Sequence, residues 1–211
     1  MTSTVLCFQH CDRSTNILCF QVPAKCPLCG ASTETTESRI PPFVIESPLT
    51  NAMSHPFSII VKPTCQQFLQ GYKDGDNLHI GVTTSNGHVY EYDEDGVCSS
   101  SEEWKSCLAV SVLYSQSYGS WRSQWDDQLL EFANRPDWSS ERYDESTHNC
   151  FDFVLGFLRT LPLGLSPLNV SSKAELCQEL VKSHTVKLGK YITIYKKIED
   201  YGYVCMPANS D

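Results

Sequence analysis

The sequence has no long apolar run and little positive charge. No stretch approaches the roughly 18 consecutive apolar residues of a membrane-spanning helix, and no apolar segment near the first residue resembles a signal peptide. Lys and Arg total 16 against 25 Asp and Glu, so the net charge is −9. We therefore expect a cytoplasmic or nuclear protein that has no membrane association and that holds no nucleic acid through bulk electrostatics.

Common nucleotide-binding and serine-hydrolase signatures are missing as well. The sequence contains no glycine-rich phosphate loop and no glycine-flanked serine nucleophile motif. Cysteine, in contrast, is abundant, with 11 among 211 residues, and hydrophobic residues at 41% can form a sizeable core. An odd number of cysteines without a secretion signal favours reduced thiols, metal ligands or a nucleophile over a disulfide framework.

Residues 1–30 carry a pattern typical of a small zinc ribbon. The run Cys26-Pro27-Leu28-Cys29-Gly30 has the spacing of one metal-binding knuckle, with a glycine that permits the tight turn. So short a segment buries little apolar surface, and a structural zinc ion would supply the missing stability. The alternative is a metal-free hairpin with incidental cysteines. The second pair of ligands would come from Cys7, His10, Cys11 or Cys19.

Two of these candidates compete with each other. Cys7-x-x-His10 has good knuckle spacing, whereas Cys11 directly follows His10, and adjacent side chains seldom point at one metal. The predicted metal ligands are therefore drawn from Cys7, His10, Cys11, Cys26 and Cys29.

The rest of the chain has an α+β pattern. We expect a zinc-ribbon-like segment over 1–30, a linker and extended segment over 31–56, and one domain over 57–211. Alternating or β-branched runs predict strands, and four-and-three spacings or capping boxes predict helices. The expected strands are 57–62, 78–84, 88–92, 108–114, 190–198 and 203–206, and the expected helices are 64–70, 101–106, 120–132, 150–161 and 172–182.

The helix expected to begin at Cys150 is the most informative element. Asn149 is a good N-cap, and Asp152 places a carboxylate near the positive end of the helix. The residues that follow are apolar around most of the circumference, so this helix should be buried at the centre of the core. A cysteine at its first position would feel the helix dipole, which favours the thiolate. The alternative is that Cys150 is an inert core residue, which is common for free cysteine.

A thiol nucleophile needs a base, and His79 is the candidate. It lies on an expected strand that returns through a hairpin turn at Ser85–Gly87, and Gly81 beside it leaves room for close approach by a backbone or a substrate. A helix N-terminus facing a histidine-bearing strand is the geometry of papain-like peptidases. In those proteins the cysteine precedes the histidine in sequence, whereas here the order is reversed, which marks the circularly permuted papain-like group.

The sequence resembles the permuted PPPDE isopeptidases, which act on ubiquitin relatives or acyl thioesters. The resemblance rests on Leu78–Val82, Val89–Tyr92 and His148–Phe153. It implies a permuted papain-like core, an antiparallel sheet packed on the central helix, with Cys150 as nucleophile and His79 as base. Asn149, Asp152 and the Cys150 amide would support the oxyanion hole or the helix start. No third residue that orients His79 is identifiable.

Part of the same pattern is similar to the lecithin:retinol-acyltransferase-like and NlpC-related group. That group often has a second histidine on the return strand, where this sequence has Tyr90 or Glu91, with His88 slightly early. The departure argues against an acyltransferase.

The whole chain also resembles the vertebrate makorin opposite-strand family. The shared features are the His10-Cys11 start, the Cys-Pro-Leu-Cys-Gly knuckle and the His-Asn-Cys-Phe-Asp-Phe run. This family implies no established activity. Two hypotheses therefore stand: a thiol hydrolase of isopeptidase or thioester-hydrolase type acting on a ubiquitin-like substrate, or a non-catalytic scaffold that binds a protein partner through the same core and the metal ribbon.

Overall fold

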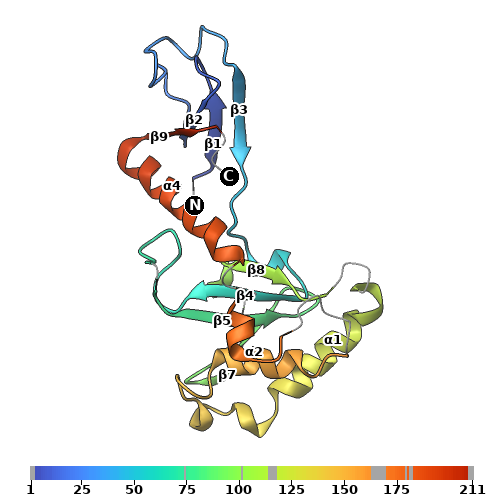
Figure 1. The fold of residues 1–211 in the computed structure, drawn as a ribbon. Coiled ribbons are helices and arrows are strands. Elements are labelled where there is room, and N and C mark those ends of the chain that lie inside the picture. The colour runs from blue at the N-terminus through green and yellow to red at the C-terminus, as the bar shows by residue number, and fades with distance from the viewer. Residues whose placement is uncertain are drawn as a thin grey trace. The chain divides into compact units, whose positions relative to one another are not determined.

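The computed structural model describes residues 3–73, 75–100, 102–113, 118–162, 170–178, 180 and 183–208 (Figure 1). The chain divides into two compact units. The first combines both ends of the chain, Met1–Pro48 and Lys187–Asp211, and the second is Leu49–Val186. No helix among the described residues is long and apolar enough to cross a membrane.

The first unit is built on a four-stranded antiparallel sheet in the order β3-β1-β2-β9. Its last strand comes from the opposite end of the chain and pairs with the second strand, β2 (Figure 1). Phe8, Ile17, Cys19 and Cys26 form its buried cluster. The strands are β1 (Val5–Gln9), β2 (Thr15–Cys19), β3 (Ile40–Ile45) and β9 (Tyr203–Pro207), and helix α4 (Ser183–Tyr201) precedes β9.

The second unit contains a five-stranded antiparallel sheet in the order β7-β6-β5-β4-β8. Helix α2 (Cys150–Leu158) packs against the central strand β5 and its neighbour β6. The strands are β4 (Ser58–Pro63), β5 (Leu78–Thr83), β6 (Val89–Asp93), β7 (Gly96–Ser100) and β8 (Leu108–Ser111). The other helices are α1 (Tyr118–Ala133) and α3 (Lys173–Cys177), with 3-10 turns at Ala52–Ser54, Glu102–Trp104, Pro136–Trp138 and Ser140–Arg142.

Aromatic side chains hold α2 in place. Phe157 meets the edge of Trp125 from α1 at 4.9 Å, and the Trp125 indole donates a hydrogen bond to the Thr83 carbonyl on β5 at 2.9 Å. Phe153 and Phe132 pack 5.5 Å apart on the same side. Because edge-to-face rings add attraction beyond the area they bury, α2 is anchored to both the sheet and α1. The sequence-based prediction of a buried central helix is confirmed.

The mixed α and β composition and most of the expected elements are also confirmed. The expected strand over 190–198 is wrong, because these residues lie within α4. Leu188, Tyr191, Ile192, Tyr195 and Ile198 are the buried residues there, and their spacing of three and four is helical. The β-branched and aromatic residues mimicked a strand because propensity is weaker than packing.

The expected helix over 64–70 is wrong as well. Gln66 has a positive φ of 72°, which a right-handed helix does not tolerate, and the chain forms short bridges around Gln67 instead. The expected helix over 101–106 is reduced to the 3-10 turn at Glu102–Trp104.

The unit boundaries also differ from those expected. The segment 31–56 includes β3, which pairs with β1, and residues 187–211 group with the N-terminal unit through β9.

We predict that Gly81→Ala destabilises the protein. Gly81 lies on β5, and a Cβ atom there would stand 2.8 Å from both the Tyr90 carbonyl oxygen and a Val89 methyl group on β6. The close approach expected beside His79 is therefore made by the neighbouring strand. Overpacking of this kind costs about 1–3 kcal/mol of unfolding free energy, which urea denaturation would measure. Gly189→Ala in α4, where a Cβ meets nothing within 4 Å, is the control. Equal stability of the two variants would contradict the prediction.

Candidate functional site

Cys150 is the first residue of α2, as the sequence predicts. The Asn149 side chain accepts a hydrogen bond from the Phe151 amide at 3.0 Å, and the Asp152 carboxylate accepts one from the Asn149 amide at 2.9 Å. This reciprocal capping box holds the first turn rigid. Asp152 also pairs with Lys173 at 2.6 Å. The two polar side chains on either side of Cys150 thus stabilise the helix start that presents the thiol.

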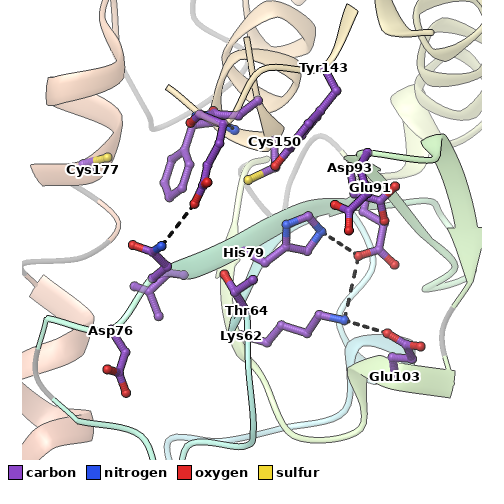
Figure 2. A pocket seen from close by; sticks show the side chains of 16 residues that line it. Lys62, Thr64, Asp76, His79, Glu91, Asp93, Glu103, Tyr143, Cys150 and Cys177 are labelled. Atoms are coloured by element: carbon purple, nitrogen blue, oxygen red, sulfur yellow. Dashed lines mark hydrogen bonds and ion pairs between the residues drawn. The ribbon is translucent and has the colours of Figure 1, made fainter. Parts of the chain in front are cut away.

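His79 lies on β5 and faces that helix start. Figure 2 shows the Cys150 sulfur directed toward the His79 ring, and the two side chains line the same cavity. The His79 Nε2 atom is 2.7 Å from a Glu91 carboxylate oxygen. Because Nε2 is occupied by Glu91, the Nδ1 atom is left for the sulfur. The structure therefore brings the predicted nucleophile and base together, although they are far apart in sequence.

Glu91 is the third member of this arrangement, and the sequence did not identify it. It lies on β6 directly opposite Gly81, so it is a diagonal neighbour of His79 on the same face of the hairpin. Its other oxygen accepts a hydrogen bond from the Trp104 indole at 3.0 Å. The Lys62 ammonium lies 3.8 Å from the carboxylate oxygen that faces His79. Lys62 itself sits over the Trp104 ring at 4.4 Å. A buried carboxylate with this many partners holds one orientation.

The charges of the pair support each other. Burial alone would raise the pKa of Glu91, but hydrogen bonds from His79 and Trp104 and the charge of Lys62 lower it. Burial alone would lower the pKa of His79, but hydrogen bonds to the Cys150 sulfur and Glu91, with their negative charges, raise it to about 9. His79 is therefore an imidazolium at neutral pH, and its Nε2–H donates to the Glu91 carboxylate.

A cavity of about 550 Å³ opens above these three side chains. This volume is in the usual range for ligand-binding pockets. Tyr143 is among its lining residues, and so is Cys177 from α3 (Figure 2). A thiol, an imidazole and a carboxylate that orients the imidazole therefore meet at one open cavity. Nucleophilic acyl transfer by a thiol uses these groups.

A separate cluster lies in the first unit. Ligand atoms of His10, Cys11, Cys26 and Cys29 all lie within 4.8 Å of one another. The Cys11 and Cys26 sulfurs are 3.9 Å apart, and the Cys29 sulfur is 3.5 Å from His10 Nδ1. Ligands at zinc-like distances from a tetrahedral centre are about 3.8 Å apart, so the cluster could hold a metal ion.

The ligand set differs from the predicted one in two respects. Cys7 is outside the cluster, because it lies within β1 and its side chain is buried in the sheet. His10 and Cys11 both contribute, contrary to the expectation that they compete. They follow the end of β1 in a bend, where side chains do not alternate as they do along a strand.

The Cys26 knuckle is shaped for a thiolate. The Gly30 amide donates to the Cys26 carbonyl at 2.8 Å and closes the turn, and the Leu28 amide points at the Cys26 sulfur at 3.4 Å. Burial would raise the pKa of Cys26, but the backbone amides of Cys29 and Leu28 and the thiols of Cys29 and Cys11 lower it. On the other side, His10 Nε2 lies 2.7 Å from the Thr36 hydroxyl, which orients the ring so that Nδ1 faces the sulfurs.

Comparison with known proteins identifies the family. The model described as DUF4796 C-terminal matches residues 42–198, and the model described as DUF4796 N-terminal matches residues 3–32. The MKRN2 opposite strand protein of Homo sapiens is 31% identical over 196 residues, which cover 93% of this chain and 86% of the relative. The chain belongs to the makorin opposite-strand family. No solved structure matches it.

The two family matches coincide with the two sites. The N-terminal match contains all four members of the Cys/His cluster, and the C-terminal match contains Cys150, His79 and Glu91. Membership of the makorin opposite-strand family confirms that resemblance seen in the sequence, and neither the family description nor the name of the relative states a chemistry.

We predict that Glu91→Gln lowers the pKa of His79 below about 9, because the amide keeps the shape and loses the negative charge. NMR titration of the imidazole would measure this. A pKa raised above the ordinary value of 6.5 stabilises the fold fully below pH 6.5, and this contribution is lost as pH rises through about 9.

The stability advantage of the wild type over Glu91→Gln should therefore shrink between pH 6 and pH 10. The control is Glu103→Gln, because Glu103 pairs with Lys62 and does not touch His79. A His79 pKa unchanged by Glu91→Gln would refute the charge-pair interpretation.

Proposed function

We propose that this protein is a thiol hydrolase of isopeptidase or thioester-hydrolase type, with a Cys150–His79–Glu91 triad. The single observation that carries the proposal is the position of His79, which shares one ring nitrogen with Glu91 and turns the other toward the sulfur of a helix N-terminal cysteine. A histidine with a purely structural role needs a hydrogen-bond partner at only one ring nitrogen. A catalytic base needs one ring nitrogen held by an orienting group and the other facing the nucleophile.

The proposed chemistry follows from these positions. The Cys150 sulfur attacks the substrate carbonyl, and its proton is held by His79 Nδ1. His79 then protonates the departing amine or thiol, which leaves an acyl thioester on Cys150. Water attacks this thioester with His79 taking its proton, and the acid product leaves as the thiol is restored. Glu91 keeps the imidazole oriented throughout, and the backbone amide of Cys150, the first residue of α2, would bind the developing oxyanion.

The arrangement of elements supports the permuted papain-like interpretation. The histidine strand β5 precedes the cysteine helix α2 in sequence, and α2 packs on β5. This order and packing are those expected from the resemblance to the PPPDE isopeptidases. On that resemblance we propose a ubiquitin-like protein conjugate or thioester as the substrate.

We predict that electrophilic ubiquitin-like probes and iodoacetamide modify Cys150 before Cys98, Cys107 and Cys177 of the second unit. At pH 6, Cys98, Cys107 and Cys177 should react slowly, because burial raises the pKa of each thiol. Mass spectrometry of tryptic peptides would identify the modified residue. Hydrolysis of a ubiquitin-like thioester should be lost in Cys150→Ala and fall at least a hundredfold in His79→Ala.

The matched control is Cys177→Ala, which removes another thiol from the same cavity and should retain activity. Thioester hydrolysis that survives Cys150→Ala would reject the proposal. A stable, unreactive Cys150 would instead favour the binding or scaffold role.

We also propose that the Cys/His cluster binds one structural zinc ion. Three thiolates and one imidazole form a common tetrahedral zinc set, and no ligand position remains open for catalysis. Elemental analysis should find one zinc per chain, and EDTA should lower the thermal midpoint.

Cys29→Ser should lose the zinc, whereas Cys7→Ala, which removes a thiol outside the cluster, should keep it. Zinc that depends on Cys7 and not on Cys29 would overturn the assignment.

A further inference from the structure

The cavity above Cys150 carries a strong excess of negative charge. Among the described residues that line it, Lys62 is the single lysine and none is an arginine. Six carboxylates line it, from Asp76, Glu91, Asp93, Glu94, Glu103 and Glu145. Lys62 is already paired with Glu91 and Glu103, and Glu91 also serves His79. Within the described part of the chain, the other four carboxylates have no ion-pair partner.

Neutral groups hold three of these four carboxylates around the cavity. Asp76 accepts the Lys73 amide at 2.8 Å, Asp93 accepts the Asp95 amide at 2.9 Å, and Glu145 accepts the Asn77 side-chain amide at 3.2 Å. Amide donors orient a carboxylate without cancelling its charge. The carboxylates come from the loop before β5, the β6–β7 turn and the loop before α2. Figure 2 shows Asp93 and Asp76 on different sides of the Cys150–His79 pair.

The same carboxylates shift the pKa of neighbouring titrating groups. The pKa of Tyr143 is raised first by burial and then by the negative charges of Cys150, Glu94, Glu145 and Asp93. The pKa of Asp93 is likewise raised, first by burial and then by Glu91 and Glu94, while the Asp95 amide and His79 lower it in part. A site that already resists further negative charge attracts cations and repels anions.

An acidic lining also excludes one class of acyl group. A fatty acyl chain in this cavity would remove water from carboxylates without offering them a partner, which is costly. Lysine and arginine side chains offer both positive charge and hydrogen-bond donors. The cavity volume of about 550 Å³ admits a short peptide segment with one or two such side chains.

We propose that the cavity selects peptide acyl groups that carry Lys or Arg within a few residues of the scissile carbonyl, with Asp93, Glu94, Asp76 and Glu145 as the specificity-determining residues. This inference rests on the proposed hydrolase function for its chemistry, but its recognition element can be measured without turnover.

The binding test uses the full chain with Cys150→Ala, so that no probe is consumed. Fluorescent peptides Lys-Ala-Lys-Gly-Gly and Glu-Ala-Glu-Gly-Gly are compared by anisotropy. We expect the basic peptide to bind at least tenfold more tightly, with the difference shrinking at 0.5 M NaCl because salt screens surface charges. Asp93→Asn with Glu94→Gln should weaken the basic peptide by about two- to fivefold for each charge removed. The control Asp95→Asn removes a carboxylate from the same turn that does not line the cavity.

Hydrolysis of the two peptide thioesters by the wild type separates the two claims. Preferred hydrolysis of the basic thioester, lost in Cys150→Ala, supports both. Equal hydrolysis of both thioesters, or preference for the acidic one, overturns the charge selectivity and leaves the hydrolase standing. If the basic peptide binds tightly but its thioester is not hydrolysed in a Cys150-dependent way, the proposed hydrolase function is wrong and the proposed recognition of basic peptides stands. Failure of the basic peptide to bind more tightly than the acidic one overturns the inference.

Discussion

The contact between His79 and Glu91 is the constraint on which the second unit's site depends. Burying one charge is expensive unless a partner and hydrogen bonds compensate it, and removing one member of such a pair leaves the other uncompensated. Trp104, Lys62 and the Cys150 sulfur complete the network around the pair. The pair ties β5 to β6 and presents the imidazole to α2. Apolar residues of similar size would stabilise the fold as well as such a pair does. A buried charge pair beside a cavity is therefore an indication of a functional site.

The first unit differs from the second in having only a small buried core. It joins the two ends of the chain through the pairing of β2 with β9, and its buried cluster is small. A small core rarely stabilises a fold by itself, and metal ligation is a common remedy. His10 and Cys11 of the Cys/His cluster follow the end of β1 in a bend. Their side chains therefore need not point to opposite sides, as neighbouring side chains do along a strand. Cysteine therefore has different surroundings in the two units: three thiols gather with His10 in the first, and Cys150 begins a helix beside a cavity in the second.

Much of the candidate site could be predicted because its signals are local. The cap at Asn149, the apolar circumference of α2 and the hairpin turn at Ser85–Gly87 each depend on residues a few positions apart. The same turn contained a further signal: a hairpin symmetric about Asn86 pairs Gly81 with Glu91 and makes Glu91 a diagonal neighbour of His79. The errors were made where local propensity and packing disagree. Residues 190–198 have β-forming side chains, but their buried stripe is helical.

The sequence by itself determined the capped cysteine helix, the histidine hairpin, the Cys26 knuckle and the acidic character of the chain, because each follows from neighbouring residues or from composition. Only the tertiary structure decided four further points. It brought His79 and Cys150 to one cavity, it selected His10 and Cys11 over Cys7, and it grouped the chain ends in one sheet. It also distributed the carboxylates of three separate loops around the thiol. These are contacts between residues distant in sequence, and packing determines them, since periodicity and spacing specify only what a segment does with its neighbours.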